Sequence, residues 1–260
     1  MCRLLGYVTR TPAALAELLG EQDLLEFTEL SCKHGDGWGA AWATDTGVEV
    51  VKAPDVARTS SAFGRHVRDH VADLGLVHLR WATLGLPIGP ENTHPFTDGT
   101  IAFAHNGSVE SPSSLDALIP GDLRRLRAGS TDSERYFLAA LAEERRGNQL
   151  YQDCRGSLAD SVAATVERIA ASHSFTSLNA MIATPDELIA VCCYDPVAEQ
   201  KEEEPDYYHM RYRVTPGAVI VSSSGWGAGW SPLPNGQILV ARRGTLDVSV
   251  GWIADARVTR

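Results

Sequence analysis

The amino-acid sequence predicts an α+β fold in which strands and helices form separate layers. Strand-like segments occur in two groups along the chain, and two long helix-like segments lie between the groups. This order differs from the regular alternation of strands and helices that indicates a parallel sheet. Because no linker composition interrupts the chain, residues 1–260 are expected to form a single domain.

Strands are predicted wherever short apolar or alternating runs end in polar or turn-forming residues. The first group comprises residues 3–8, 39–44, 47–53, 75–83 and 100–107. The second group comprises residues 177–184, 187–195, 207–214, 217–223, 237–243 and 245–251.

Apolar side chains at helical spacing predict the helices. In residues 132–146 these are Phe137, Leu138 and Leu141, and a Ser-Thr-Asp cap signal precedes them. Residues 157–172 carry a similar apolar face. Two shorter helices are expected at residues 13–19 and 62–70.

Composition and charge exclude several classes of function. The formal net charge is -10, and such an acidic surface repels phosphate backbones and anionic lipid, so neither nucleic acid nor a membrane is expected as a partner. The apolar runs are too short to cross a bilayer, and no secretion signal is seen at the N-terminus. Five cysteines in irregular spacing do not form a disulfide framework, so a reducing cytoplasm is the expected location.

Cys2 directly follows the initiator methionine. If Met1 is removed, one residue carries both a thiol and a free α-amine, whose reference pKa values lie near 8.5 and 8. The amine can then serve as the general base for its own side chain. The alternative is that Cys2 only begins a buried strand.

Five segments stand in a fixed order: "MCRLLGY", "HGDGWGAAW", "LRWATLG" followed by "NTHPF", "FAHNGSV" and "GSTDSERYF". Together they resemble the class II glutamine amidotransferases, which are N-terminal nucleophile (Ntn) hydrolases with a terminal cysteine. The resemblance implies a four-layer αββα sandwich and a cysteine-dependent amidohydrolase. Cys2 is then the nucleophile.

The resemblance also assigns groups that bind a γ-glutamyl substrate. Arg80 matches the arginine that holds the substrate α-carboxylate as a bidentate pair, with help from Trp81 and Thr83. Asp132 matches the acid that binds the α-ammonium group. The alternative for Asp132 is a helix N-cap, since a helix begins there.

Attack on an amide creates an oxyanion, which needs preorganised N–H donors. By the same resemblance, the side-chain amide of Asn106 and the main-chain N–H of Gly107 form this oxyanion hole. The alternative is a type I′ hairpin turn, for which Asn-Gly is the usual signal.

The sequence offers no metal-binding motif, and no cofactor is expected. The glycine-rich "GDGWG" lacks the lysine and spacing of a phosphate loop, so Asp36 and Trp38 are read as structural or pocket-lining. His78, His94 and His105 are expected to act as core or network residues.

Members of the family often have histidine where this chain has Leu84, and no acceptor-using module is recognisable after the glutaminase-like region. Two activities therefore remain: a glutaminase that passes ammonia to a separate synthase, or a stand-alone γ-glutamyl hydrolase. The second includes a type similar to the hydrolases of ergothioneine biosynthesis. A non-catalytic glutamine-sensing domain is the third alternative, although it would not need Cys2.

Overall fold

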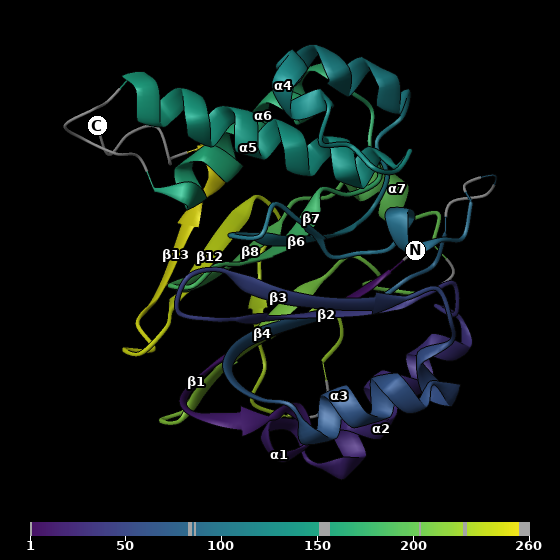
Figure 1. Cartoon of the computed structure of the whole chain (residues 1–260), viewed down its shortest axis with the longest axis vertical. Helices are drawn as coiled ribbons and strands as arrows, with labels where there is room; N and C mark the ends of the chain where they lie inside the picture. Colours follow the sequence, from purple (N-terminus) through teal and green to yellow (C-terminus); the bar gives the residue numbers. More distant parts are fainter. Residues whose placement is uncertain are drawn as a thin grey trace.

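The computed structural model places two antiparallel sheets face to face between two layers of helices (Figure 1). The structure describes residues 2–82, 85, 87–150, 157–202, 204–225 and 228–254. The order of layers is helices, sheet, sheet, helices. The α+β sandwich of αββα type that the sequence predicted is therefore confirmed.

The strands form one seven-stranded and one six-stranded sheet within the described residues. The order in the larger sheet is β11 (Ser231–Leu233), β9 (Met210–Val214), β10 (Ala218–Ser222), β1 (Arg3–Ala14), β4 (Val71–Leu79), β2 (Trp38–Ala43) and β3 (Val48–Ala53). The order in the smaller sheet is β13 (Val248–Trp252), β12 (Gln237–Arg242), β8 (Glu187–Cys192), β7 (Asn179–Ala183), β6 (Ala102–Asn106) and β5 (Phe96–Thr97).

Helices cover the outer face of each sheet (Figure 1). The larger sheet carries α1 (Leu15–Leu19), α2 (Glu21–Glu29) and α3 (Ser61–Asp69). The smaller sheet carries α5 (Asp132–Leu150) and α6 (Leu158–Ser172), with α4 (Gly121–Arg124) beside them. The remaining helices are α7 (Pro196–Glu199) and the 3₁₀ turns η1 (Leu30–Cys32), η2 (Ala57–Thr59), η3 (Pro90–Asn92) and η4 (Pro112–Leu118). No helix in the described ranges is both long and apolar enough to cross a membrane.

Three apolar layers hold the sandwich together. The layer between the two sheets includes Leu4 and Leu76 from the larger sheet and Met181 and Leu188 from the smaller. All residues of β7 and β8 are buried, because one face of these strands meets the other sheet and the opposite face meets α5 and α6. This explains why both strands are apolar after their first residues, Asn179 and Glu187, rather than alternating.

Several element boundaries differ from the predictions. β1 continues to Ala14 through a shift in register, so the helix predicted at residues 13–19 begins only at Leu15. The strand predicted at residues 207–214 begins only at Met210. Before it, the ring of Tyr207 packs under the guanidinium of Arg3, an interaction that no local pattern in the sequence indicates.

The register of the larger sheet brings distant segments to one edge. β1 begins beside the end of β4, where Arg3 pairs with Leu79, and β2 begins there as well, where Trp38 pairs with Leu79. Residues just before β1 and β2 therefore lie beside residues just after β4. Cys2 and Arg80 are such residues.

Candidate functional site

A small pocket at this edge collects side chains from segments that are far apart in the sequence. Of the seven site residues predicted from the sequence, Cys2, Arg80, Trp81, Gly107 and Asp132 line it. Its other described lining residues are Ala82, Asn92, His94, His105, Thr131 and Ser133. The space between them is about 20 Å³, little more than one water molecule needs.

The thiol of Cys2 lies at the base of this pocket. The residue is only 7% exposed, and burial raises the pKa of the thiol, although the positive charge of Arg80 acts in the opposite direction. The Cys2 Sγ lies 3.7 Å from the carbonyl oxygen of Trp81. A thiol in this environment needs a nearby base before it can act as a nucleophile.

Asn106 ends β6 directly opposite Cys2. Its Oδ1 accepts a hydrogen bond of 3.1 Å from the main-chain N–H of Cys2. Its Nδ2 is buried and has no hydrogen-bond partner among the described residues. A buried amide donor without a partner costs free energy, unless a ligand supplies the acceptor.

Gly107 follows Asn106 and is packed against another chain segment. A Cβ atom added at Gly107 would lie 1.9 Å from the carbonyl oxygen of Ser177, so only glycine fits. The type I′ hairpin turn offered as an alternative is wrong. Asn106 pairs with Asn179, and the chain continues in extended form until Val109 bridges Phe175.

Arg80 is a buried cation with few partners. It is 3% exposed, and among the described residues its guanidinium donates only to the carbonyl oxygens of Asp36 (3.3 Å) and Pro87 (3.4 Å). Within the described part of the chain, no carboxylate side chain forms an ion pair with it. Burial lowers the pKa of this guanidinium, and the nearby carboxylates of Asp36 and Glu91 act in the opposite direction. A buried charge that lacks a bonded counter-ion is costly. Trp81 is 40% exposed at the mouth of the pocket, and Thr83 lies outside the described residues.

Asp132 occupies the first position of α5, across the pocket. The alternative of a helix N-cap is wrong, because the Oγ1 of Thr131 accepts the hydrogen bond from the main-chain N–H of Glu134. The Asp132 carboxylate instead accepts hydrogen bonds from the N–H of Val109 (2.7 Å) and the hydroxyl of Ser133 (3.4 Å). No described lysine or arginine pairs with it.

Three buried histidines form a neutral layer beside the pocket. The two ring nitrogens of His105 lie 2.9 Å from Ser133 Oγ and 2.9 Å from the carbonyl oxygen of Ser177. The rings of His78 and His94 pack with their centres 4.1 Å apart. Burial lowers the pKa of His78 to about 3 and also lowers the pKa values of His94 and His105. The described residues contain no group of three His, Cys, Asp or Glu placed to hold a metal ion.

Asn92 and Ser133 also line the pocket, although neither was predicted from the sequence as a site residue. Asn92 holds the loop before α5, because its Oδ1 accepts a hydrogen bond of 2.9 Å from the main-chain N–H of Ser130. Both residues belong to motifs that carry the family resemblance, "NTHPF" and "STDSE". Their place in these motifs could have identified them as residues of the site.

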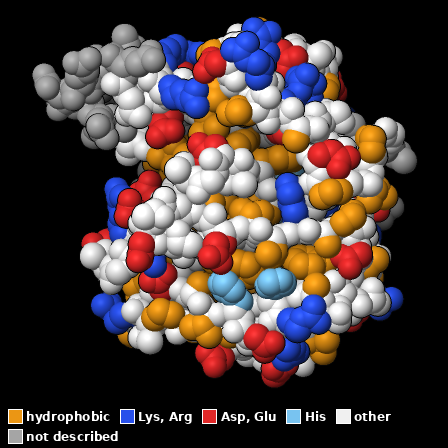
Figure 2. Space-filling model, in the orientation of Figure 1, with side chains coloured by type: hydrophobic (Ala, Val, Ile, Leu, Met, Phe, Trp, Pro, Cys, Tyr) orange, Lys and Arg blue, Asp and Glu red, His pale blue; other side chains and the backbone are white. Residues whose placement is uncertain are grey.

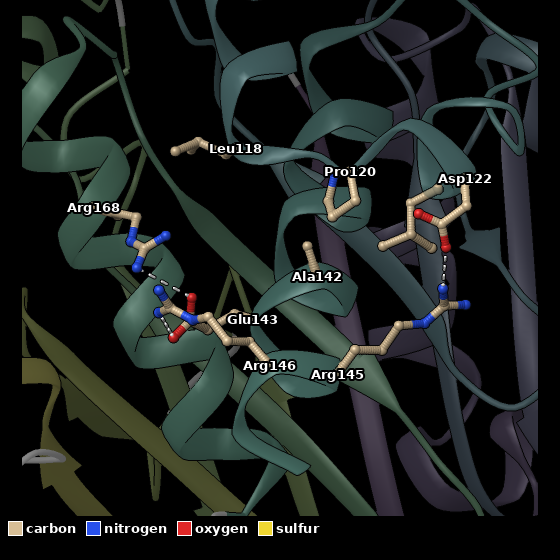
Figure 3. Close-up of a pocket in the computed structure, with 9 residues that line it drawn as sticks. Leu118, Pro120, Asp122, Ala142, Glu143, Arg145, Arg146 and Arg168 are labelled. Carbon is tan, nitrogen blue, oxygen red and sulfur yellow. Dashed lines mark hydrogen bonds and ion pairs between the residues drawn. The ribbon is translucent and has the colours of Figure 1, made fainter. Parts of the chain in front are cut away.

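A second, larger pocket of about 420 Å³ lies among the outer helices (Figure 3). Figure 2 shows Lys and Arg side chains gathered at the top of the molecule, over α4 and α5. In this pocket Arg145 pairs with Asp122, while Arg146 and Arg168 both pair with Glu143. Since the described lining residues include no nucleophile and no unpaired cation, we place the candidate site in the pocket around Cys2.

The family model described as class II glutamine amidotransferases matches residues 1–256. The gamma-glutamyl-hercynylcysteine sulfoxide hydrolase of Mycolicibacterium smegmatis is 26% identical over 253 residues, which are 93% of this chain and 96% of that protein. The glutamine–fructose-6-phosphate aminotransferase of Aquifex aeolicus is 31% identical over 195 residues. That alignment covers 74% of this chain but only 29% of the Aquifex protein.

Solved structures show the same fold. A glutamine aminotransferase class-II domain protein from Silicibacter pomeroyi has a TM-score of 0.63 at 22% identity, and the match covers 96% of this chain and 99% of that one. The glutamine phosphoribosylpyrophosphate amidotransferase of B. subtilis has a TM-score of 0.63 at 16% identity, covering 97% of this chain and 49% of that one. At these identities the likeness concerns the fold alone.

Proposed function

This chain belongs to the class II glutamine amidotransferases, and we propose that it hydrolyses a γ-glutamyl amide to glutamate plus ammonia or an amine. The observation that carries the proposal is a set of polar and charged groups around the Cys2 thiol that lack matching partners. Among the described residues, the Arg80 guanidinium has no carboxylate partner, the Asp132 carboxylate has no lysine or arginine partner, and the Nδ2 of Asn106 has no hydrogen-bond partner. They complement the α-carboxylate, the α-ammonium and the amide oxygen of a γ-glutamyl group.

In the proposed reaction, removal of Met1 exposes the α-amine of Cys2. The amine takes the thiol proton, and the sulfur attacks the amide carbon. The resulting oxyanion accepts hydrogen bonds from the Asn106 side chain and the Gly107 main chain. The amine then gives the proton to the leaving nitrogen, and the C–N bond breaks to leave a glutamyl thioester.

Water completes the cycle. The same α-amine removes a proton from a water molecule, which attacks the thioester carbon, and the sulfur leaves as glutamate forms. The raised pKa of the Cys2 thiol supports a mechanism with a base in immediate reach. The three histidines near the pocket have lowered pKa values from burial, and we assign none of them as that base.

The leaving group has two candidate classes. The Mycolicibacterium hydrolase aligns over nearly the full length of both chains, which favours a stand-alone hydrolase of a substituted γ-glutamyl compound. The Aquifex aminotransferase aligns over less than a third of its own length, so similarity to it supports only glutamine as the donor. A glutaminase that delivers ammonia to a separate synthase is the second candidate.

The test combines intact mass with product release. The mass shows whether Met1 has been removed, and glutamate release is then measured with glutamine and with γ-glutamyl amides that carry larger leaving groups. We expect release by the processed wild-type protein and none by Cys2→Ala. No release from any of these amides by the processed protein would favour the non-catalytic glutamine-sensing alternative.

A further inference from the structure

The loop that precedes β2 is bonded to the segment that follows β4. The main-chain N–H of Asp36 donates to the carbonyl oxygen of Arg80 (3.0 Å), and the N–H of Arg80 donates to the carbonyl oxygen of Gly37 (2.8 Å). The Arg80 guanidinium donates to the carbonyl oxygen of Asp36 at 3.3 Å. Since these contacts use only main-chain atoms of the loop, they do not require an aspartate at position 36.

One further contact does depend on the aspartate side chain. The Oδ2 of Asp36 accepts a hydrogen bond of 2.8 Å from the main-chain N–H of Ala82. The loop therefore holds the 80–82 segment on both sides of Trp81. Burial lowers the pKa of the Arg80 guanidinium, and the nearby carboxylate of Asp36 is one of the negative groups that counter this effect.

Asp36 is not among the described residues that line the pocket. Its carboxylate can therefore affect the substrate through the segment that it holds and through its charge near Arg80. Arg80 has little else to orient it, because its guanidinium otherwise contacts only the carbonyl oxygen of Pro87 among described groups. Because the Arg80 guanidinium makes so few hydrogen bonds, its orientation depends on the position of the main chain at residue 80.

We propose that Asp36 is a positioning residue for substrate recognition. Its carboxylate fixes the 80–82 segment, so that the Arg80 guanidinium faces the substrate α-carboxylate. The inference rests on the proposed γ-glutamyl hydrolysis and extends it to a residue outside the pocket. Displacement of a binding group by about 1 Å can cost as much as 100-fold in rate.

Two variants at position 36 distinguish the loss of the side-chain hydrogen bond to Ala82 from a general effect on packing. Asp36→Ala removes the acceptor for Ala82, and kcat/KM for glutamine should fall at least about 10-fold, mainly through KM. Asp36→Asn keeps an acceptor oxygen and should retain kcat/KM within about threefold of wild type. The matched control is Asp55→Ala, because Asp55 accepts a hydrogen bond of 2.6 Å from the Trp38 indole beside the same strand. This control should leave KM unchanged even if stability falls.

A second readout does not involve the contact between Arg80 and a carboxylate. Iodoacetamide carries no carboxylate, and its rate of reaction with Cys2, followed by mass spectrometry of the N-terminal peptide, should change less than about threefold in Asp36→Ala. Wild-type KM in Asp36→Ala, or equal losses of glutamine turnover and alkylation, would overturn the inference while leaving the proposed function intact. If Asp36→Ala does not fold, Asp36→Asn is measured alone. A folded Asp36→Asn protein whose kcat falls while its KM for glutamine stays unchanged would then overturn the inference. An inactive processed wild type would remove both proposals.

Discussion

The main-chain N–H of Cys2 donates a 3.1 Å hydrogen bond to Oδ1 of Asn106. This contact fixes the orientation of the side-chain amide, so that the buried Nδ2 faces away from Cys2 N and meets no acceptor among the described residues. The residue that carries the thiol therefore also orients a donor for the proposed oxyanion. The proposed nucleophile and the proposed oxyanion donor are linked by one hydrogen bond across 104 positions of sequence.

Asn106→Asp tests this coupling. The variant keeps an oxygen to accept from Cys2 N–H but replaces the Nδ2 donor by a second acceptor. We expect kcat for glutamate release to fall by about 10²–10³, the usual effect of removing one oxyanion-hole donor, with a smaller change in KM. Steady-state kinetics check this. A variant with wild-type kcat would show that Asn106 only supports the position of Cys2.

Cys2→Ala should abolish turnover and leave the thermal unfolding transition of the protein little changed, because the side chain is small and alanine fits its space. A glutamine-like electrophile such as a diazo-ketone analogue should label Cys2 and none of the other four cysteines. Peptide mapping by mass spectrometry locates the label. Protein that retains Met1 should react slowly, because an amide nitrogen is not a base. Full activity of that form would show that another group accepts the thiol proton.

Arg80→Lys keeps the positive charge but loses the planar fork that matches a carboxylate. We expect kcat/KM to fall by roughly 10²-fold or more for every γ-glutamyl amide, since the proposed contact is with the α-carboxylate, which all these substrates share. Asp132→Asn should act similarly through the α-ammonium. The control is Arg10→Lys, because Arg10 is exposed on the same sheet. Equal kinetics for Arg80→Lys and the control would contradict the assignment.

The sequence predicted the layers of the fold and five of the residues that line the pocket, because both depend on motifs and on local apolar patterns. It did not resolve whether Asn106-Gly107 forms a turn, since that depends on pairing with Asn179, more than seventy positions away. It also did not identify Thr131 as the cap of α5. The role of the Asp36 side chain depends on a contact with Ala82, which no local pattern encodes.

The buried histidines predict how stability depends on pH. In the folded protein the pKa of His78 is lowered to about 3, and burial also lowers the pKa values of His94 and His105. In the unfolded chain they should titrate near 6.5. The unfolded state therefore binds more protons below about pH 6.5, and stability falls with decreasing pH, by about 1.4 kcal/mol per pH unit for each fully neutral histidine.

Urea unfolding at pH 7, 6 and 5 measures this slope. The imidazole signals of His78 and His105 in NMR spectra of the folded protein should remain those of neutral rings between pH 7 and 5. Equal free energies of unfolding at pH 7 and 5, together with titrating imidazole signals, would show that these rings can be charged in the folded state.

Gly107→Ala tests how closely two segments of the site approach. The added Cβ would lie 1.9 Å from the carbonyl oxygen of Ser177, and that oxygen cannot withdraw without stretching its 2.9 Å contact with His105 Nε2. We expect the free energy of unfolding to fall by about 1–3 kcal/mol or more, as for other overpacked sites. Activity should also fall, because the Gly107 N–H is one of the two proposed oxyanion donors.

Gly121→Ala is the matched control, because an added Cβ there would meet no atom within 4 Å. Its free energy of unfolding should stay within about 0.5 kcal/mol of wild type. Urea unfolding and glutamate release are measured on both variants. If Gly107→Ala matched the control in stability but lost activity, the main chain could make room for a Cβ. The loss of activity would then come from the catalytic step and not from overpacking. If it matched the control in both, Gly107 would have neither the packing role nor the catalytic role.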